Sequence, residues 1–90
     1  MTFIYRLHAI ERMFERNISQ KDVEVVFKYG ETIEVYVEDK PYPSFLVLAY
    51  IEQRPLHVVF AKDDEENVFV ITAYEPTLLK WQNNMKTRKD

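Results

Sequence analysis

The sequence predicts an α+β domain in which two N-terminal helices pack on a four-stranded antiparallel sheet, followed by a short C-terminal helix. Helical spacing of apolar residues dominates residues 1–30, and four runs of β-type residues follow, separated by turn residues. No repeat or linker divides the 90 residues, which can form one hydrophobic core. We therefore expect residues 1–90 to be a single domain, with helices on one sheet face and the other face free to hold a site.

The first helix is predicted over residues 6–16. Its apolar positions, Leu7, Ile10, Met13 and Phe14, recur at helical spacing. An amphipathic helix buries its apolar stripe against the rest of the domain. We therefore expect these four side chains to face the core.

The second helix is predicted over residues 20–29, and both of its ends carry local signals. Ser19 as the N-cap, with Asp22 three positions later, forms a variant of the capping box. Val23 and Val26 then face the core. Gly30, the single glycine of the chain, is placed where a left-handed residue commonly ends a helix.

The four strands are predicted over residues 32–37, 45–51, 56–61 and 68–74. Apolar and polar residues alternate in the first run, whereas the continuous apolar run Phe45–Ile51 is typical of a central strand. The last three runs form a meander because turn residues separate them. Pro76 ends the last strand, and we expect a short helix over residues 77–85.

The composition excludes several classes of protein. The chain is 47% apolar and has no cysteine, so no disulfide, thiolate nucleophile or thiolate metal site can form. No apolar run is long enough to be a signal sequence or to cross a bilayer. We therefore expect a cytoplasmic protein with no membrane partner.

Charge is distributed unevenly along the chain. The formal net charge is −3, which argues against bulk electrostatic binding of nucleic acid, because such binding neutralises many phosphates. Basic residues gather near both ends, in residues 6–21 and after Thr77, and acidic residues gather in the middle. If the two ends meet in the fold, they will form a local basic patch.

A cationic stripe lies along the first predicted helix. His8, Arg12 and Arg16 are spaced four residues apart, so they follow one side of the helix, almost opposite the apolar side. A solvated face paired with Glu11 and Glu15 explains this stripe without any function. The functional alternative is that the stripe borders a cleft or a partner.

His57 stands inside an apolar strand, where an aliphatic residue is the ordinary choice. If the last hairpin pairs Lys62 with Asn67, His57 lies opposite Thr72, and Tyr74 projects from the same face. A histidine among hydroxyls can act as a general acid or base, because its ordinary pKa is about 6.5. It can equally be a hydrogen-bonded histidine of the core.

The segment Asp39–Pro43 holds an aromatic residue between two prolines. Lys40 and Tyr42 can contact a phosphate and stack a nucleobase, or the segment is a rigid bend before the central strand. The acidic run Asp63–Glu66 lacks the ligand spacing of a calcium loop and is typical of a solvated turn. With two histidines and no glycine-rich phosphate loop, the chain predicts no metal and no other cofactor.

Four segments, taken together and in this order, resemble one known family. They are His8 to Ser19, Lys40 to Ser44, Arg54 to Val59, and Val70 to Pro76 followed by Trp81. They resemble the bacterial domain-of-unknown-function 4258 family. That family is similar in outline to RelE-like toxin ribonucleases, in which helices precede an antiparallel sheet whose exposed face cleaves RNA.

The resemblance implies a metal-independent endoribonuclease of a toxin–antitoxin system, with RNA as substrate and a small antitoxin as partner. It assigns His8, Arg12 and Arg16 to one motif and His57 with Tyr74 to another. Such cleavage needs a base, an acid and cations that stabilise the charged transition state. Lys40, Tyr42 and Thr72 are then the candidate substrate-binding residues.

A hypothesis of a different class stays open, in which the protein is a non-catalytic interaction module that can form a homodimer. In that case the central strand or the C-terminal helix contributes to a protein interface. The enzyme hypothesis predicts His, Arg and Tyr side chains in one cleft. The interaction module predicts that those residues are dispersed and that an apolar patch of several hundred Å² is exposed.

Overall fold

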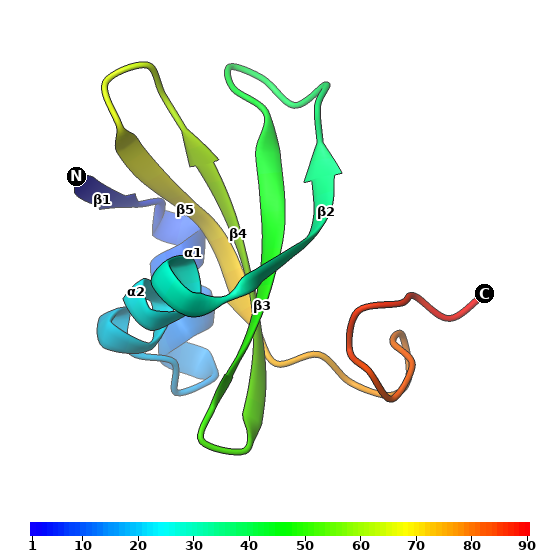
Figure 1. Cartoon of the computed structure of the whole chain (residues 1–90). Coiled ribbons are helices and arrows are strands. Elements are labelled where there is room, and N and C mark those ends of the chain that lie inside the picture. Colours follow the sequence, from blue (N-terminus) through cyan, green and yellow to red (C-terminus); the bar gives the residue numbers. More distant parts are fainter.

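The computed structural model describes all residues from 1 to 90. In chain order the elements are β1 (Thr2–Tyr5), α1 (Leu7–Glu15), α2 (Gln20–Tyr29), β2 (Glu31–Tyr36), β3 (Ser44–Ile51), β4 (Arg54–Lys62) and β5 (Asn67–Tyr74). The strands form one sheet in the order β1-β5-β4-β3-β2, shown in Figure 1. Neither helix has the length and apolar character that a bilayer crossing requires.

This architecture corrects the predicted four-stranded antiparallel sheet. The fold is α+β with two helices, but the sheet has five strands and is mixed. The additional strand, β1, has four residues and runs parallel to β5, while all other neighbours are antiparallel. Because β1 pairs only with the far end of the chain, no local sequence pattern indicates it.

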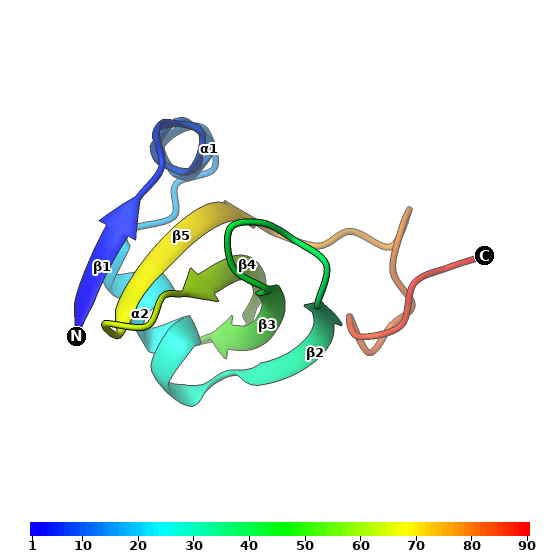
Figure 2. The ribbon, with the colours of Figure 1, turned by 90° about the horizontal axis from the view of Figure 1, so that it is seen from above.

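Different parts of the chain cover the two faces of the sheet. On one face, Ala9 and Met13 of α1 join Val23 and Val26 of α2 and the inward side chains of the strands in the main hydrophobic cluster. On the opposite face lie residues 76–90, called the C-terminal segment below (Figures 1 and 2). The chain itself therefore covers part of the face that we expected to be free.

α1 lies at the edge of the sheet beside β5, because it follows directly from β1 (Figure 2). Only Ala9 and Met13 are buried in this helix. Leu7, Ile10 and Phe14 were expected in the core but are 72%, 47% and 88% exposed. The helix therefore docks through Ala9 and Met13, and the rest of its apolar stripe faces solvent.

α2 begins as predicted and ends for a different reason. The Ser19 hydroxyl accepts from the Asp22 amide at 3.0 Å, and the Asp22 carboxylate accepts from the Ser19 amide at 3.1 Å, which completes the capping box. Gly30 has φ −78°, which is not left-handed. A Cβ there would lie 2.5 Å from both the Val26 carbonyl oxygen and Val47 Cγ1. Glycine is therefore needed for space.

The C-terminal segment contains no helix, which corrects the prediction for residues 77–85. One turn forms when the Trp81 amide donates to the Thr77 carbonyl at 3.0 Å, and the chain then reverses. The side-chain oxygen of Asn84 accepts from the Thr87 amide at 3.1 Å. Such local side-chain bonds compete with helical ones and favour turns.

Candidate functional site

His57 and Tyr74 form a hydrogen-bonded pair on β4 and β5, where they are direct cross-strand neighbours. The His57 side chain is completely buried. Its Nε2 lies 2.7 Å from the carbonyl oxygen of Met85, which can only accept, so Nε2 carries the hydrogen. In the neutral ring Nδ1 is then an acceptor, and the Tyr74 hydroxyl donates to it at 3.2 Å.

Burial shifts the proton affinities of both members of the pair. It lowers the pKa of His57 below the ordinary value of 6.5, although the Met85 carbonyl acts in the opposite direction. It raises the pKa of Tyr74 above 10.0. At neutral pH the phenol is therefore protonated, and the imidazole is neutral and able to accept a proton.

The register between β4 and β5 differs from the predicted one. Lys62 pairs with Val68, because Asn67 closes a turn with Asp63, whose amide donates to the Asn67 carbonyl at 3.2 Å. The pairing then shifts once more between Val59 and Phe60, where a bulge lies. Together these two shifts place Tyr74, in place of Thr72, opposite His57.

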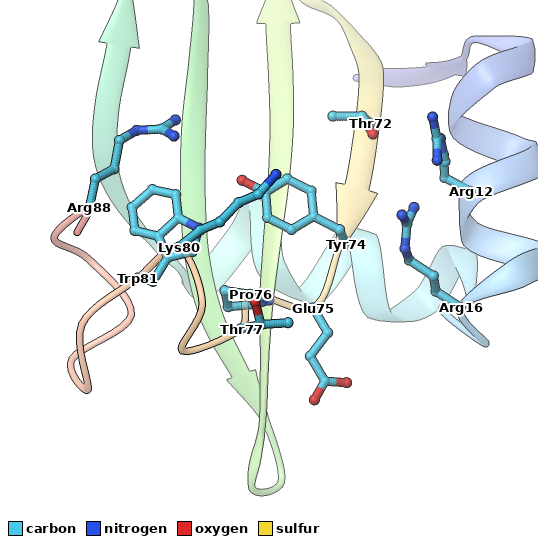
Figure 3. A pocket seen from close by; sticks show the side chains of 10 residues that line it. All are labelled: Arg12, Arg16, Thr72, Tyr74, Glu75, Pro76, Thr77, Lys80, Trp81 and Arg88. Atoms are coloured by element: carbon cyan, nitrogen blue, oxygen red, sulfur yellow. The ribbon is translucent and has the colours of Figure 1, made fainter. Parts of the chain in front are cut away.

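Tyr74 lines a pocket of about 490 Å³ between α1, the end of β5 and the C-terminal segment (Figure 3). His57 does not line this pocket. Tyr74 is therefore the member of the pair that a bound ligand can meet. Most of the lining residues are basic, aromatic or hydroxyl-bearing; they are Arg12, Arg16, Thr72, Tyr74, Glu75, Pro76, Thr77, Lys80, Trp81 and Arg88.

The pocket is cationic on a chain whose net charge is negative. Arg12, Arg16 and Lys80 form no ion pair within the chain. Arg88 is occupied, since its guanidinium donates twice to the Glu34 carboxylate, at 2.9 and 3.0 Å. In Figure 3 the two α1 arginines lie on one side of Tyr74, and Lys80 with Arg88 on the other.

Arg54 fixes the end of α1 that carries the pocket arginines. Its guanidinium donates to the carbonyl oxygens of Arg16 and, at 2.9 Å, of Asn17. It also holds the carboxylate of Glu75 at 2.8 Å, and that side chain points away from Tyr74 in Figure 3. Glu75 is therefore paired with Arg54 and does not neutralise Arg12, Arg16 or Lys80.

The structure brings together some of the predicted site residues. Arg12, Arg16, Thr72 and Tyr74 line one pocket, and His57 is bonded to Tyr74 from behind. The expectation that the two basic ends meet therefore holds in this pocket, where residues of α1 and of the C-terminal segment face each other.

Other predicted site residues lie elsewhere. His8 is exposed and lines a depression on the outer side of α1 with Glu11 and Phe14. Lys40 and Tyr42 line a cavity of about 210 Å³ formed with Arg6 and the side chains of Phe69 and Ile71 on β5. His8 therefore shares no pocket with Tyr74. The cavity of Lys40 and Tyr42 lies against Phe69 and Ile71, a different part of β5 from the one that carries Tyr74.

Sequence reasoning missed the contribution of the C-terminal segment. Trp81 is only 2% exposed and packs edge-on against the His57 ring, with 4.5 Å between the ring centroids. Arg88 stacks over Trp81 at 4.6 Å, and Lys80 supplies a pocket cation. The gathering of positive charge after Thr77 was the one available signal, and it did not indicate which residues meet the sheet.

This arrangement can bind an anion and move a proton beside it. The guanidinium groups of Arg12 and Arg16 match the geometry of phosphate oxygens, and the Tyr74 proton can pass to His57. No three His, Asp or Glu side chains are grouped so that they could hold a metal ion. The lining therefore suits an anionic ligand.

Fold and site thus define a small α+β protein with a cationic pocket around a tyrosine–histidine pair. The chain matches, over residues 5–75, the family described as a domain of unknown function, DUF4258. Because the match spans most of the chain, the protein belongs to this family, as its sequence motifs predicted. A search of curated proteins and a search of solved structures each found no match.

Proposed function

We propose that this protein is a RelE-like endoribonuclease of a toxin–antitoxin system that cleaves RNA without a metal ion. One observation carries the proposal: Tyr74 lines the same pocket as the unpaired cations Arg12, Arg16 and Lys80, and its hydroxyl is bonded to the neutral, buried His57. A local cationic pocket on an acidic chain suits the binding of one phosphodiester better than the coating of a whole nucleic acid.

The proposed reaction uses the 2′-hydroxyl of the RNA as nucleophile. As this oxygen attacks the adjacent phosphorus, its proton passes to the Tyr74 oxygen, and the phenolic proton passes to Nδ1 of His57. The bond to the 5′-oxygen breaks, and Lys80, the unpaired pocket cation with a transferable proton, protonates that oxygen. The products are a 2′,3′-cyclic phosphate and a 5′-hydroxyl.

The remaining cations act on the charge of the transition state. Negative charge grows on the non-bridging oxygens as the attacking bond forms, and Arg12 and Arg16, which line the pocket from α1, are the cations proposed to stabilise it. Their fork of donors can bind two oxygens at once. Thr72, on the same face as Tyr74, adds a hydroxyl to the pocket wall.

The proposal is tested by induced expression in a bacterial host, with growth and the integrity of total RNA as readouts. The test variants are His57→Ala and Tyr74→Phe. The matched control is Tyr50→Phe, because Tyr50 is exposed and makes no side-chain hydrogen bond. We expect the wild type and the control to arrest growth with cleaved RNA, and both test variants to lose these effects.

Intact RNA and normal growth with soluble, folded wild-type protein would contradict the ribonuclease proposal. So would a Tyr74→Phe variant that cleaves RNA as fast as the wild type does. Folding of each variant is checked by circular dichroism, so that loss of activity through unfolding is recognised.

A second candidate function, a protein-interaction module, is favoured by the exposed apolar face of α1. Leu7, Ile10 and Phe14 lie on one side of this helix and point to solvent. Three large apolar side chains at helical spacing are rarely left exposed without a partner. The face lies on α1, whereas the sequence placed an interface on the central strand or the C-terminal helix.

The charges beside this face indicate the kind of partner. Glu11 and Glu15 flank it, form no ion pair, and repel each other as like charges four residues apart. The helix has nine residues, so it is about 14 Å long and about 10 Å wide. One side of it therefore offers on the order of 140 Å², which is small beside the roughly 800 Å² that each subunit of a stable dimer buries. We therefore propose one amphipathic helix of another protein, with basic residues beside its apolar stripe.

This second proposal is tested with an amphipathic helical peptide whose flanking residues are lysines, compared with the same peptide carrying glutamates. We expect the lysine peptide alone to bind, and Phe14→Ser to abolish that binding. Sedimentation of the protein alone tests for a second copy on this face. A dimer that Phe14→Ser dissociates would replace the helix proposal, and equal binding of both peptides would contradict it.

A further inference from the structure

We infer that the C-terminal segment is a positioning element of the site. Its Met85 carbonyl holds His57 in the tautomer that carries the hydrogen on Nε2, which leaves Nδ1 as the acceptor for the Tyr74 hydroxyl. The inference concerns the state of His57, which can be measured without RNA. Its consequence for cleavage rests on the proposed ribonuclease function. Three features of the segment support it: its contacts with His57, its anchoring to β2, and the backbone conformation of Met85.

The segment surrounds the His57 ring on the face opposite the helices. The Met85 carbonyl accepts the Nε2 hydrogen at 2.7 Å, and Trp81 packs edge-on against the ring. These contacts bury His57 completely. With Nε2 engaged by an acceptor, Nδ1 is left as the basic nitrogen, and it is the nitrogen that the Tyr74 hydroxyl meets.

The segment is held to the edge of the sheet by the pairing of Arg88 with Glu34 on β2. Arg88 binds Glu34 through two hydrogen bonds and stacks on Trp81, whereas the neighbouring Lys86–Glu31 pair at 2.9 Å is exposed and contributes little. A guanidinium that makes two hydrogen bonds to one carboxylate is held in a defined orientation and is also bound more strongly. Arg88 therefore ties the part of the segment that contains Trp81, which contacts His57, to β2.

The backbone conformation of Met85 is unusual, and it determines where the carbonyl of this residue points. Met85 has φ 60°, a left-handed conformation that residues other than glycine rarely adopt. Its amide donates to the Gln82 carbonyl at 2.9 Å, and the Asn84 side chain holds the residues that follow. Local strain of this kind persists where surrounding contacts enforce it, and here it directs the Met85 carbonyl at His57.

The segment lies outside the part of the chain that matches the family, which ends at residue 75. Nevertheless it supplies Lys80, Trp81 and Arg88 to the pocket and the acceptor for His57. The tautomer of His57 is thus set by residues that the family match does not include. A chain with the same strands and a different C-terminal segment is expected to hold this histidine differently.

The tautomer is measured by proton–nitrogen correlation spectra of the histidine rings, in which the two neutral tautomers have distinct nitrogen shifts. The chain has two histidines, and the signals of the exposed His8 are assigned with His8→Gln. We expect wild-type His57 to be more than 90% in the form with hydrogen on Nε2. We expect Met85→Val and Arg88→Ala to produce a mixture of the two tautomers.

Two matched controls separate positioning from general loosening of the segment. Met85→Gly keeps the carbonyl and favours a positive φ, whereas the β-branched valine opposes it, so the glycine variant should keep the wild-type tautomer. Lys86→Ala breaks the neighbouring ion pair to Glu31 without touching Trp81 or His57, and it should leave both the tautomer and the RNA cleavage rate unchanged.

The outcomes distinguish this inference from the ribonuclease proposal. The inference is overturned if wild-type His57 carries its hydrogen on Nδ1, or if Met85→Val and Arg88→Ala keep the wild-type tautomer. If the spectra agree with the inference and wild-type protein does not cleave RNA, only the proposed function fails. If both hold, the same two variants should lower the cleavage rate at least 10-fold and shift its pH profile, while Lys86→Ala does neither.

Discussion

The hydroxyl of Tyr74 donates to Nδ1 of His57 across 3.2 Å, and only the tyrosine reaches the pocket. The histidine lies behind it, with its other nitrogen bonded to the Met85 carbonyl. This order, from pocket to phenol to imidazole to carbonyl, resembles a general-base relay in which each group orients the next.

Removing the Tyr74 hydroxyl should abolish proton transfer and preserve the fold. Tyr74→Phe keeps the ring that packs near His57, so we expect the unfolding free energy to fall by only about 1–2 kcal/mol for the lost bond. The cleavage rate should fall roughly 100-fold or more, as for loss of a general base. Initial rates on a defined RNA and urea denaturation measure the two effects, and an equal loss with Tyr50→Phe would show that the effect is not specific.

Neutralising the α1 arginines should weaken RNA binding and its dependence on salt. Each of Arg12→Gln and Arg16→Gln should reduce the slope of log affinity against log salt by about 0.7, the value for one contact to a single-strand phosphate. Lys28→Gln, on α2 and outside the pocket, is the control that removes equal charge. Titrations at four salt concentrations measure the slopes, and identical slopes for all three variants would place the RNA elsewhere.

The burial of His57 makes the stability of the fold depend on pH. Its pKa in the folded protein lies below 6.5 because burial disfavours the charged ring, so the unfolded chain binds more protons between the folded pKa and 6.5. Stability should therefore fall as pH falls through this window and recover as pH rises above it. Urea unfolding at several pH values measures this slope, and His57→Gln should reduce it; an unchanged slope would assign it to other groups.

A side chain at position 30 should destabilise the fold. A Cβ in Gly30→Ala would lie 2.5 Å from Val47 Cγ1 and 2.8 Å from the Leu48 carbonyl, so the β2–β3 pairing or the end of α2 must shift. We expect a loss of about 1–3 kcal/mol, typical of overpacking. Ser19→Ala, at the other end of α2, should cost about 1 kcal/mol through its lost cap. A neutral Gly30→Ala would show that the backbone adjusts freely.

Signals within a few residues of each other predicted α2, but no such signals predicted β1. The Ser19 cap and the following apolar positions act within a few residues, so the sequence contains them in full. β1 is short, and its pairing with β5 joins the two halves of the chain, which no local pattern contains. Similarly, the turn at Met85 depends on contacts with β2 and β4 and replaces a predicted helix.

The orientation of α1 shows why the site was only partly predictable. Periodicity correctly located the helix and the spacing of Arg12 and Arg16, but it assigned the core to the side with Leu7 and Phe14. Of the predicted core positions only Met13 is buried, and the helix docks through it and Ala9, because β1 places α1 at the edge of the sheet. The arginines consequently border a pocket, which the sequence offered as one of two alternatives.

The most direct test of the central claim uses purified protein and a short RNA with a single preferred cleavage position, in the presence of a metal chelator. A matched oligonucleotide carries one 2′-deoxy sugar at that position. We predict that wild-type protein cleaves the RNA to a 2′,3′-cyclic phosphate end, leaves the deoxy substrate intact, and loses at least 100-fold in rate when Tyr74 is changed to Phe. No cleavage by folded protein, cleavage of the deoxy substrate at the same bond, or an unchanged rate with Tyr74→Phe would contradict the account.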